Sequence, residues 1–565
     1  MFRKTVCVMV IATASASAIS QSLLNPAYTA ETFATGIAAP VTMAVVGPEE
    51  FFICEKPTGI VKHRLRGQWL DDLIDLNVAG GAELGLLGIC LDPDYSVIPF
   101  VYLFYASAST DGEEWIEDRV DKYLVVGSRL RFVKNVWKSP YDPNQNNGTS
   151  HHGGVIAVGP DRKLYICYGD LGRGRFDDPR IETNTGMNAA SGSGSIYRVN
   201  LDGTTPNDNP FAGSKIPELR NVWAFGIRNS FGIAFDPFSD NVWFTENGPD
   251  AYDELNLGFP GMNSGWLKIT GPDSRDARYF ENEYHAYESD ELSNIQGSRY
   301  SDPAFSWLTT IAPTAIVFPN TPKFSVGDQN LMLVTDANNG NIYAFDLSFS
   351  RTRIEYKSGT SDTVADSDAE RDQYLFGSGF GLVSDAKLGV DGYLYVVDLG
   401  QGRVVRVRPV QEFESVQAVS LRKGKYISGT VGSFSDSDDD RYVLEAAFTP
   451  MGDADSVSVE LKAHADTALF KKLSLQIETS APDIHLHQTI ELYNTTFRVW
   501  VQVDSRIIRE VESETTVDFL GIAQHCIDPD TGEIRVRITA RPSGMSLFPN
   551  WQWQADKVSF VLNAN

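Results

Sequence analysis

The chain has 565 residues, of which 42% are hydrophobic, and a formal net charge of −26 at pH 7. This length and apolar content provide enough core material for roughly two to four globular domains. The strong negative charge argues against a nucleic-acid-binding protein, because phosphate contacts need clustered Lys and Arg side chains. A neutral or cationic partner is therefore expected.

Residues 1–18 are predicted to be a secretory signal peptide. Arg3 and Lys4 supply its positive region, residues 6–11 its apolar region, and residues 16–18 an Ala-Ser-Ala cleavage site. No later apolar run reaches the roughly 18 residues that a membrane-spanning helix needs. We expect a secreted or periplasmic protein without a membrane span.

Four cysteines remain outside the predicted signal peptide. Cys54, Cys90 and Cys167 lie in apolar, strand-like runs, and Cys526 lies far from them in the sequence. Buried thiols are therefore favoured over a disulfide framework, and no Cys-x-x-Cys spacing supports a zinc site.

A repeated unit occurs along the first three quarters of the chain. It consists of an apolar strand, a turn with Asp, Gly or Pro, and a second strand rich in aromatic and branched residues. The six instances are residues 43–55, 87–104, 155–169, 232–246, 331–347 and 382–397. With almost no helical signal, they predict an all-β, six-bladed β-propeller over residues 25–410, with its blades arranged around a central channel.

A different pattern follows over residues 420–565. Apolar and polar residues alternate there with a period of two, which predicts half-buried strands in a C-terminal β-sandwich. The acidic run from Ser435 to Asp440 could bind calcium, but a solvated loop is favoured because the spacing of a complete calcium loop is absent. Trp551 and Trp553 could stack on sugars. However, aromatic residues two apart on a strand share one face, and such a pair more often fills a core.

The segment Ser150–Gly154 reads Ser-His-His-Gly-Gly and leads directly into a strand, a Pro-Asp turn and a second strand. Histidine has an unperturbed pKa of about 6.5, so it can accept a proton near neutral pH. The glycines allow a ligand to approach the backbone. Neighbouring side chains on an extended segment point apart, so only one of His151 and His152 should face a substrate. Alternatively, both are ordinary turn histidines.

Four segments, in this order, resemble the glucose/sorbosone dehydrogenase family, the soluble quinoproteins that use pyrroloquinoline quinone (PQQ). They are Glu83–Gly88, His151–Gly154, Gly226–Asn229 and Glu246–Trp266, and the similarity extends from Asn25 to Pro409. The resemblance implies a six-bladed propeller with a site at one mouth of its channel. It also implies PQQ-dependent oxidation of an aldose or related sugar hydroxyl to a lactone, with calcium and an external electron acceptor.

The resemblance further implies roles for individual residues. His151 matches the base that removes the proton of the sugar hydroxyl while hydride leaves for the quinone. Arg228 and Asn229 match the pair that contacts the quinone, with Arg228 stabilising developing charge. Glu83 stands where the family has Gln or a similar residue in the quinone site. A structural salt bridge is the competing interpretation of Arg228.

Two calcium sites are implied in the same way. The backbone carbonyls of Gly248 and Pro249 match those that hold calcium against the quinone, where it polarises the accepting carbonyl. The side chain of Glu254 and the main-chain carbonyl of Ser264 match a structural calcium site. A solvent-exposed acidic loop containing Asp253 and Glu254 is the alternative.

Three positions depart from the family pattern. Asn338 aligns with a lysine, and Leu382 and Ser384 align with arginines, although PQQ carries three carboxylates. Each lost charge-assisted contact is worth about 1.5–3 kcal/mol of binding free energy. Two alternatives follow: a non-catalytic propeller that binds a glycan or protein, and a calcium-dependent lactonase.

Overall fold

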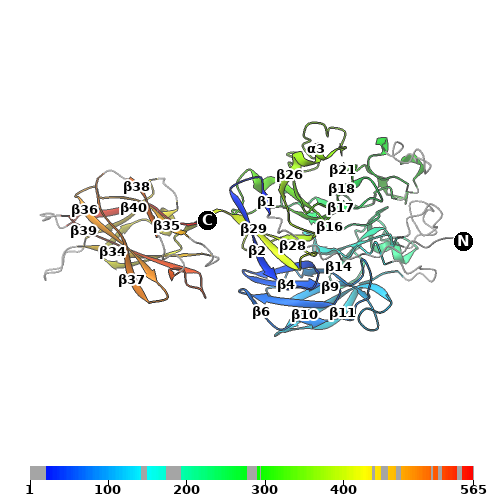
Figure 1. Ribbon diagram of the computed structural model, residues 1–565, viewed down its shortest axis with the longest axis horizontal. Helices are drawn as coiled ribbons and strands as arrows, with labels where there is room; N and C mark the ends of the chain where they lie inside the picture. The colour runs from blue at the N-terminus through cyan, green and yellow to red at the C-terminus, as the bar shows by residue number, and fades with distance from the viewer. Residues whose placement is uncertain are drawn as a thin grey trace. The chain divides into compact units, whose positions relative to one another are not determined.

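The structure is a computed structural model, and the chain divides into two compact units (Figure 1). The first unit contains Thr29–Arg408 and N-terminal residues up to Asn25, and the second contains Pro26–Tyr28 and Pro409–Asn565. The described residues are 21–140, 149–172, 192–266, 268–275, 289–292, 294–435, 439–446, 456–465, 472–510, 513–519, 525–543 and 550–563.

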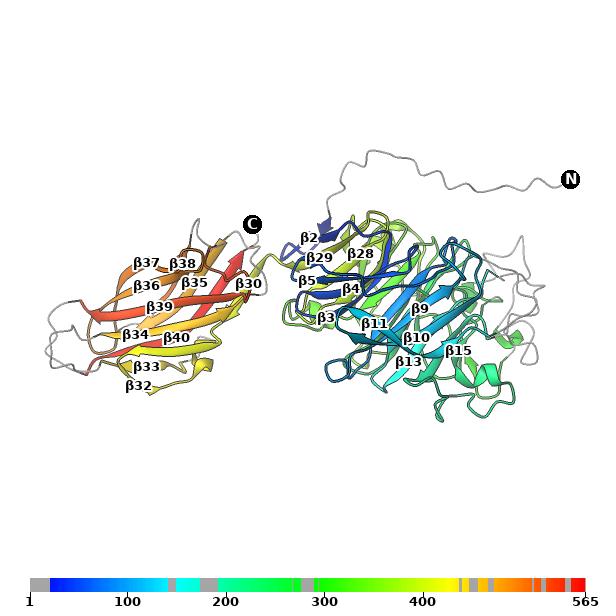
Figure 2. The ribbon, with the colours of Figure 1, turned by 90° about the horizontal axis from the view of Figure 1, so that it is seen from below.

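Within the described residues, the first unit forms six sheets, each starting from one inner strand. The inner strands are β3 (Pro40–Gly47), β8 (Leu86–Leu91), β12 (Ile156–Val158), β16 (Gly232–Phe235), β22 (Pro313–Val317) and β27 (Val383–Leu388). Each inner strand contacts the next in chain order, and β27 contacts β3. The ring is therefore closed, and the prediction of a six-bladed β-propeller is confirmed (Figures 1 and 2).

Further strands extend each blade outward from the channel. In the first three blades they are β4 (Glu50–Glu55), β5 (Ile60–Leu65), β6 (Gln68–Trp69) and β7 (Ile74–Asp75); β9 (Phe100–Ser107), β10 (Glu117–Val126) and β11 (Arg129–Lys138); and β13 (Lys163–Tyr168), β14 (Ser195–Asn200), β15 (Val222–Phe225), β19 (Met262–Asn263) and β20 (Arg299–Tyr300). In the last three they are β17 (Val242–Glu246), β18 (Asp253–Gly258), β21 (Phe305–Trp307) and β25 (Val364–Ala365); β23 (Met332–Asp336), β24 (Ile342–Phe345), β26 (Leu375–Ser378) and β1 (Ser22–Leu23); and β28 (Leu394–Asp398), β29 (Arg403–Pro409) and β2 (Tyr28–Thr35). The described helices are short: η2 (Pro217–Asn221), η3 (Ser289–Glu291), η4 (Asp328–Asn330), α3 (Asp368–Arg371), η5 (Asp372–Tyr374) and η6 (Val431–Phe434).

The recurring turn aspartates of the sequence have a clear structural role. Asp161 accepts a hydrogen bond from the Tyr165 hydroxyl (3.0 Å) through one oxygen and from the Lys163 amide (3.1 Å) through the other. Asp391 does the same with the Tyr395 hydroxyl, at 2.6 Å. Each carboxylate thus fixes the hairpin between an inner strand and its neighbour, and ties it to an aromatic ring packed between blades.

Strands from the N-terminal end complete the last two blades. β2 is the outer neighbour of β29 in the sixth blade, and Figure 2 shows blue β2 beside yellow-green β29. Glu31 of β2 binds two arginines of β29: its Oε1 accepts from Arg406 Nε (2.9 Å) and its Oε2 from Arg408 Nη2 (3.1 Å). The pairing of β2 with β29 therefore closes the ring by joining the N-terminal and C-terminal ends of the propeller.

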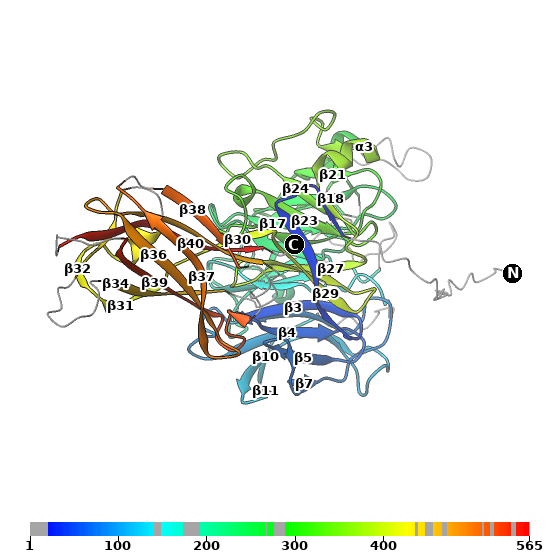
Figure 3. The same cartoon turned by 60° about the vertical axis from the view of Figure 1, so that its left-hand side comes forward.

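The second unit contains two sheets that enclose one apolar core. One sheet contains β30 (Gln411–Ser415), β32 (Lys425–Ser428), β33 (Tyr442–Glu445), β35 (Lys472–Ser480), β38 (Ser513–Asp518) and β40 (Gln552–Asn563). The other contains β31 (Ala418–Lys423), β34 (Val457–His464), β36 (Leu486–Asn494), β37 (Val499–Ile508) and β39 (Glu533–Pro542), all labelled in Figure 3. The predicted β-sandwich is confirmed.

Both tryptophans near the C-terminus lie in this core. Trp551 and Trp553 are 0% and 1% exposed, and the Trp553 indole N–H donates to Gln488 Oε1 at 2.8 Å. They cannot stack on a ligand at the surface, so the core interpretation is confirmed. Of the acidic run, residues 436–438 lie outside the described residues.

The four cysteines in the described residues are free thiols. Cys54, Cys167 and Cys526 are buried and Cys90 is partly buried, and burial raises the pKa of the Cys167 thiol to about 12. The predicted signal peptide, 1–18, lies outside the described residues. None of the helices within the described ranges has the length and hydropathy of a membrane span.

Candidate functional site

The inner strands of a propeller run in the same direction, so the residues that precede them gather at one mouth of the channel. A cavity of about 470 Å³ occupies this channel. All six blades contribute to its mostly apolar lining, and the charged lining residues are Lys56, Glu83, Asp385 and Lys387. Glu83 and Gly153 each lie three residues before their inner strands, and Asn247 follows β17 at the same mouth.

His151 is held beside the mouth in an unusual backbone conformation. Its φ of 61° is left-handed, which is uncommon for a residue with a side chain, and its amide donates to Glu83 Oε2 at 2.7 Å. Its Nδ1 lies 2.6 Å from Asp170 Oδ1, and the side chain is 15% exposed. Because Asp170 accepts the proton on Nδ1, Nε2 is left as the proton acceptor.

Asp170 is a functional candidate that sequence reasoning missed. It is fully buried, and its other oxygen accepts a hydrogen bond from Trp266 Nε1 at 2.8 Å. It follows β13, the second strand of the hairpin that begins after His151. The sequence carried a signal for it, because a hairpin returns the end of its second strand to the start of its first.

His152 has a different environment. It is fully buried, its Nδ1 lies 2.8 Å from Asp118 Oδ2, and its ring packs edge-on against Trp115 at 5.1 Å. The two imidazoles point to different partners, as expected, although the left-handed φ of His151 shows that the segment is not extended there.

Glu83 and Asn229 hold the histidine turn. Glu83 Oε2 accepts from Asn229 Nδ2 at 3.0 Å as well as from the His151 amide, and Asn229 Oδ1 accepts from the Gly153 amide at 3.2 Å. Gly153 has a φ of 63°, and a Cβ there would lie 2.6 Å from the Cys167 carbonyl oxygen. Only glycine fits this position, so the motif depends on it.

Arg228 lies between these groups and the predicted calcium turn. Its Nη1 donates to the Asn247 carbonyl at 2.8 Å, and its guanidinium lies 5.5 Å from the centre of the Trp266 ring. Within the described part of the chain it forms no ion pair, so the salt-bridge interpretation is not supported. The indole thus contacts both Arg228 and Asp170, which places Arg228 next to the histidine–aspartate pair.

The Gly248–Pro249 turn is fixed by Asp253. Asp253 Oδ1 accepts from the Gly248 amide at 2.8 Å, and Oδ2 accepts from the amides of Ile311 and Ala312 at 2.6 and 2.7 Å. Burial raises the pKa of Asp253 to about 6 in spite of these bonds. Its oxygens are therefore engaged in holding the turn rather than open to a metal.

Glu254 and Glu246 form a buried pair of carboxyl groups. Glu254 Oε1 accepts from the Gly271 amide at 2.6 Å, and Glu246 Oε2 accepts from the Ser264 hydroxyl at 2.8 Å. Burial and the charge of Glu246 raise the pKa of Glu254, and burial raises that of Glu246 to about 7. The alternative of an exposed acidic loop is wrong, since Asp253 and Glu254 are 1% and 3% exposed.

The oxygen atoms around Glu254 suit a hard cation. Asn256 donates to Glu254 Oε2 at 3.0 Å, while its own Oδ1 is buried without a partner among the described residues. Calcium accepts mixed sets of carboxylate, amide and carbonyl oxygens. No group of three or more His, Cys, Asp or Glu side chains within the described ranges could hold a metal, so a site here needs amide and main-chain oxygens.

Two of the three positions that depart from the family pattern line the channel. Leu382 and Ser384 line the cavity, and Asn338 donates to the Thr310 carbonyl at 3.2 Å. Lys56, which sequence reasoning missed, also lines the cavity, and its Nζ donates to the Ala82 carbonyl at 2.9 Å. No ion pair of Lys56 occurs in the described structure, so its charge is open to an anionic ligand.

With this geometry established, comparison with known proteins assigns the chain to a class. Residues 37–406 match the family model described as Glucose / Sorbosone dehydrogenase. The chain belongs to this family and is an oxidoreductase that acts on the CH–OH groups of sugars.

Particular relatives agree with this class. The aldose sugar dehydrogenase YliI of Escherichia coli is 25% identical over 326 residues, which cover 58% of this chain and 77% of the relative. Quinoprotein glucose dehydrogenase B of Acinetobacter calcoaceticus is 30% identical over 209 residues, which cover 35% and 42%. The crystal structure of the soluble aldose sugar dehydrogenase of Escherichia coli in the apo-form is similar with a TM-score of 0.51 at 22% identity, over 68% of this chain and 99% of that one. The structural likeness supports the propeller fold.

Proposed function

We propose that this protein oxidises an aldose, or a related sugar hydroxyl, to a lactone with PQQ and calcium, and passes the electrons to an external acceptor. The observation that carries the proposal is the arrangement of His151, Asp170 and Arg228 at the mouth of the channel. Fold membership alone would not assign this chemistry.

The proton of the sugar hydroxyl goes to Nε2 of His151. Asp170 holds the proton on Nδ1, orients the ring and stabilises the imidazolium that forms. The C–H hydrogen leaves with its electron pair, so the carbon gains a carbonyl and the sugar loses two hydrogens in total. When bound, PQQ would supply the two-electron acceptor for that hydride. Arg228 would stabilise the negative charge that develops on it.

The residues at the mouth fit such a cofactor. Lys56 and Arg228 are cations without an ion pair in the described residues, and each can bind a carboxylate. Asn247 Oδ1 is a buried acceptor without a partner among the same residues, and it lines the cavity, where a cofactor N–H could donate to it. Asn229 and Glu83 would position the turn against the cofactor. Lys56 and Arg228 would thus replace part of the positive charge that is lost where Asn338, Leu382 and Ser384 stand in place of a lysine and two arginines.

We place calcium at two positions. The carbonyls of Gly248 and Pro249 would hold one ion at the mouth, in a turn that Asp253 fixes. Glu254 and the Ser264 carbonyl, with Asn256 Oδ1 as a further oxygen, would hold the second. A cation there would neutralise the repulsion between Glu246 and Glu254.

The test is reconstitution of the purified protein with PQQ and Ca²⁺. PQQ binding is measured by fluorescence titration, and turnover by dye reduction with a panel of aldoses. Saturable PQQ binding together with aldose-dependent dye reduction supports the proposal. Absence of both contradicts it.

A second candidate is a propeller that binds a glycan without turning it over, favoured by the neutral Leu382 and Ser384 in the cavity lining. It predicts glycan binding without PQQ binding in the same titration. The lactonase alternative needs calcium held by side chains in the channel. The carboxylates of the described lining, Glu83 and Asp385, instead bind amide, hydroxyl and ammonium groups of the protein.

We also propose that residues 1–18 direct export and are removed. The charge, apolar run and cleavage site of this segment support the proposal. Mass spectrometry of the exported protein tests it, because cleavage after Ala18 leaves Ile19 as the first residue.

A further inference from the structure

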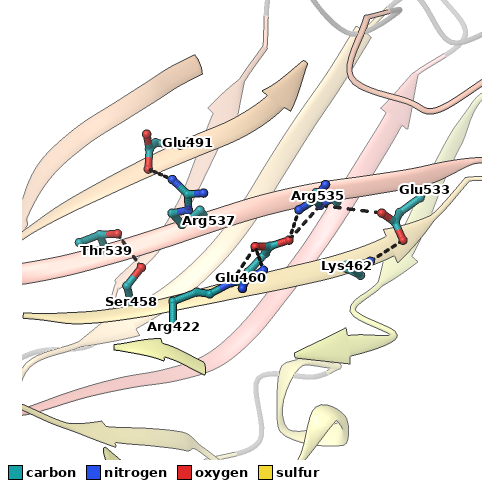
Figure 4. Close-up of polar contacts among 9 residues, drawn as sticks. All are labelled: Arg422, Ser458, Glu460, Lys462, Glu491, Glu533, Arg535, Arg537 and Thr539. Atoms are coloured by element: carbon teal, nitrogen blue, oxygen red, sulfur yellow. Dashed lines mark hydrogen bonds and ion pairs between the residues drawn. The ribbon is translucent and has the colours of Figure 1, made fainter. Parts of the chain in front are cut away.

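The outer face of one sandwich sheet has a hollow of about 470 Å³ (Figure 4). Its lining contains only polar side chains, which come from β31, β34, β36 and β39: Arg422, Ser458, Glu460, Glu491, Arg535, Arg537 and Thr539. Ser458 and Thr539 are short, and their hydroxyls lie 2.9 Å apart between the longer side chains. The hollow therefore exists because short hydroxyl residues face each other across β34 and β39.

Glu460 is the fixed centre of this face. Its side chain is 1% exposed although it lies on the outer side of the sheet, because two arginines cover it. Arg422 Nε donates to Oε2 at 2.9 Å, and Arg535 Nε donates to Oε1 at 2.8 Å. Burial alone would raise the pKa of Glu460, but these two arginines lower it, so the carboxylate stays charged. An exposed, solvated charge run would not bury its central carboxylate.

Aromatic rings hold the guanidinium groups from the side. Arg537 lies 3.9 Å from the centre of the Trp500 ring, and Arg535 lies 4.4 Å from that of Tyr493. The two rings pack against each other at 5.2 Å. Stacked and paired guanidinium groups lose little further conformational freedom when a ligand binds, so the donors are preorganised.

The donor and acceptor groups define the ligand. In the described residues, Nη1 of Arg422 and of Arg535 makes no hydrogen bond, so both arginines keep donors for a ligand. Glu491, whose carboxylate contacts Arg537 Nη1 at 3.4 Å, offers acceptors at the rim. Hydroxyl groups both donate and accept, so a polyhydroxyl ligand can satisfy both kinds of group.

Charge favours a neutral ligand over an acidic one. Three arginines and two glutamates line the hollow, for a formal charge of +1, in a chain of net charge −26. The net negative charge of the chain as a whole would repel a polyanion. A neutral saccharide meets no such penalty.

We propose that this face, defined by the seven lining residues, binds a neutral oligosaccharide or polysaccharide. The interaction lies within the sandwich, so it requires neither PQQ nor calcium. Its experimental outcome is independent of the dehydrogenase activity proposed above.

The test is affinity electrophoresis of the full chain through gels that contain soluble starch, mixed-linkage β-glucan, xylan or glucomannan. The wild type is expected to be retarded by at least one of them. Glu491→Gln and Arg537→Gln each remove one charged partner from the rim, where the side chains are 27% and 29% exposed, and should weaken that retardation by about tenfold. Thr539→Trp fills the hollow without removing a charge and should abolish retardation.

Lys462→Gln is the matched control. Its ion pair with Glu533, 2.7 Å long, joins the same two strands, and Lys462 does not line the hollow, so its loss should leave retardation unchanged. The proposal is overturned if no neutral polysaccharide retards the wild type, or if the control weakens retardation as much as the rim variants. It is also overturned if only a uronate polymer retards the protein and 0.5 M NaCl abolishes the effect.

Discussion

At the scale of single residues, the site depends on the backbone at His151. A left-handed φ on a residue with a side chain costs on the order of 1 kcal/mol, and the bond from its amide to Glu83 helps to offset it. The strained turn directs the imidazole to Asp170, while His152 points to Asp118. The two adjacent histidines therefore have different hydrogen-bond partners.

Asp170→Asn tests the positioning role of this carboxylate. The amide can still contact the ring but cannot fix the same tautomer or stabilise the imidazolium, so kcat should fall by about 10³–10⁴. PQQ binding should not change. A loss of PQQ binding that matches the loss of kcat would show that Asp170 is merely structural.

Lys56→Gln tests whether this lysine binds the cofactor. Burial lowers the pKa of Lys56 while the charge of Glu83 raises it, and the ammonium contacts only carbonyl oxygens among the described residues. Removing it should weaken PQQ binding by about 10–100-fold. Lys387→Gln is the control, since Asp385 already pairs with that lysine at 3.0 Å. Equal losses in the two variants would contradict the assignment.

At the scale of elements, the closing pair of β2 and β29 is held by Glu31. Arg408 and Arg406 lower the pKa of Glu31 although burial opposes the shift. A lowered pKa stabilises the fold above the unfolded-state value of about 4.5, and this contribution is lost as the pH falls through the folded-state pKa.

Glu31→Gln should therefore lower the free energy of unfolding by about 1.5–3 kcal/mol at pH 7. The difference from wild type should shrink as the pH falls below about 4.5. Urea unfolding at several pH values measures both effects. Glu117→Gln, whose partners Arg119 and Lys138 are more exposed, should cost less than about 0.5 kcal/mol. A difference at pH 7 that persists unchanged into acid would exclude the ionic role.

The element that carries Glu254 provides a calcium test. Calcium should raise the Tm of the propeller by about 2–4 °C for each kcal/mol of binding free energy, and EGTA should reverse the rise. Glu254→Gln should reduce this rise to the part that the ion at Gly248 and Pro249 contributes, whereas Asn in place of the exposed Asp250 in the neighbouring turn should keep the full rise. Differential scanning calorimetry measures the shift. An undiminished calcium response in Glu254→Gln would place the second ion elsewhere.

The sequence predicted the elements better than their partners. Its six repeats marked the blades, and turn aspartates fix the hairpins of the third and sixth of them, at Asp161 and Asp391. The partners Asp170 and Lys56 were missed, because many carboxylates and lysines follow strands and only the folded ring decides which of them reach one mouth. The pairing of β2 with β29 was also missed, since alternation shows that a strand exists but not what it pairs with.

At the scale of the whole molecule, the two units contain different kinds of candidate site. The propeller has a mostly apolar channel with charged groups at its mouth, and the sandwich has a polar hollow on one sheet. The period-two pattern of residues 420–565 predicted the sandwich but not this hollow. The hollow depends on which short and long side chains face each other across β34 and β39, and single-sequence periodicity does not give that register.

Closure of the ring by β2 sets the order of events during synthesis. The blade that contains β2 cannot form until β29, which ends at Pro409, has left the ribosome. Pairing two segments so far apart in the sequence has a large entropic cost of loop closure, which slows folding. We therefore expect a nascent propeller to remain an open chain of blades until synthesis of this unit is complete.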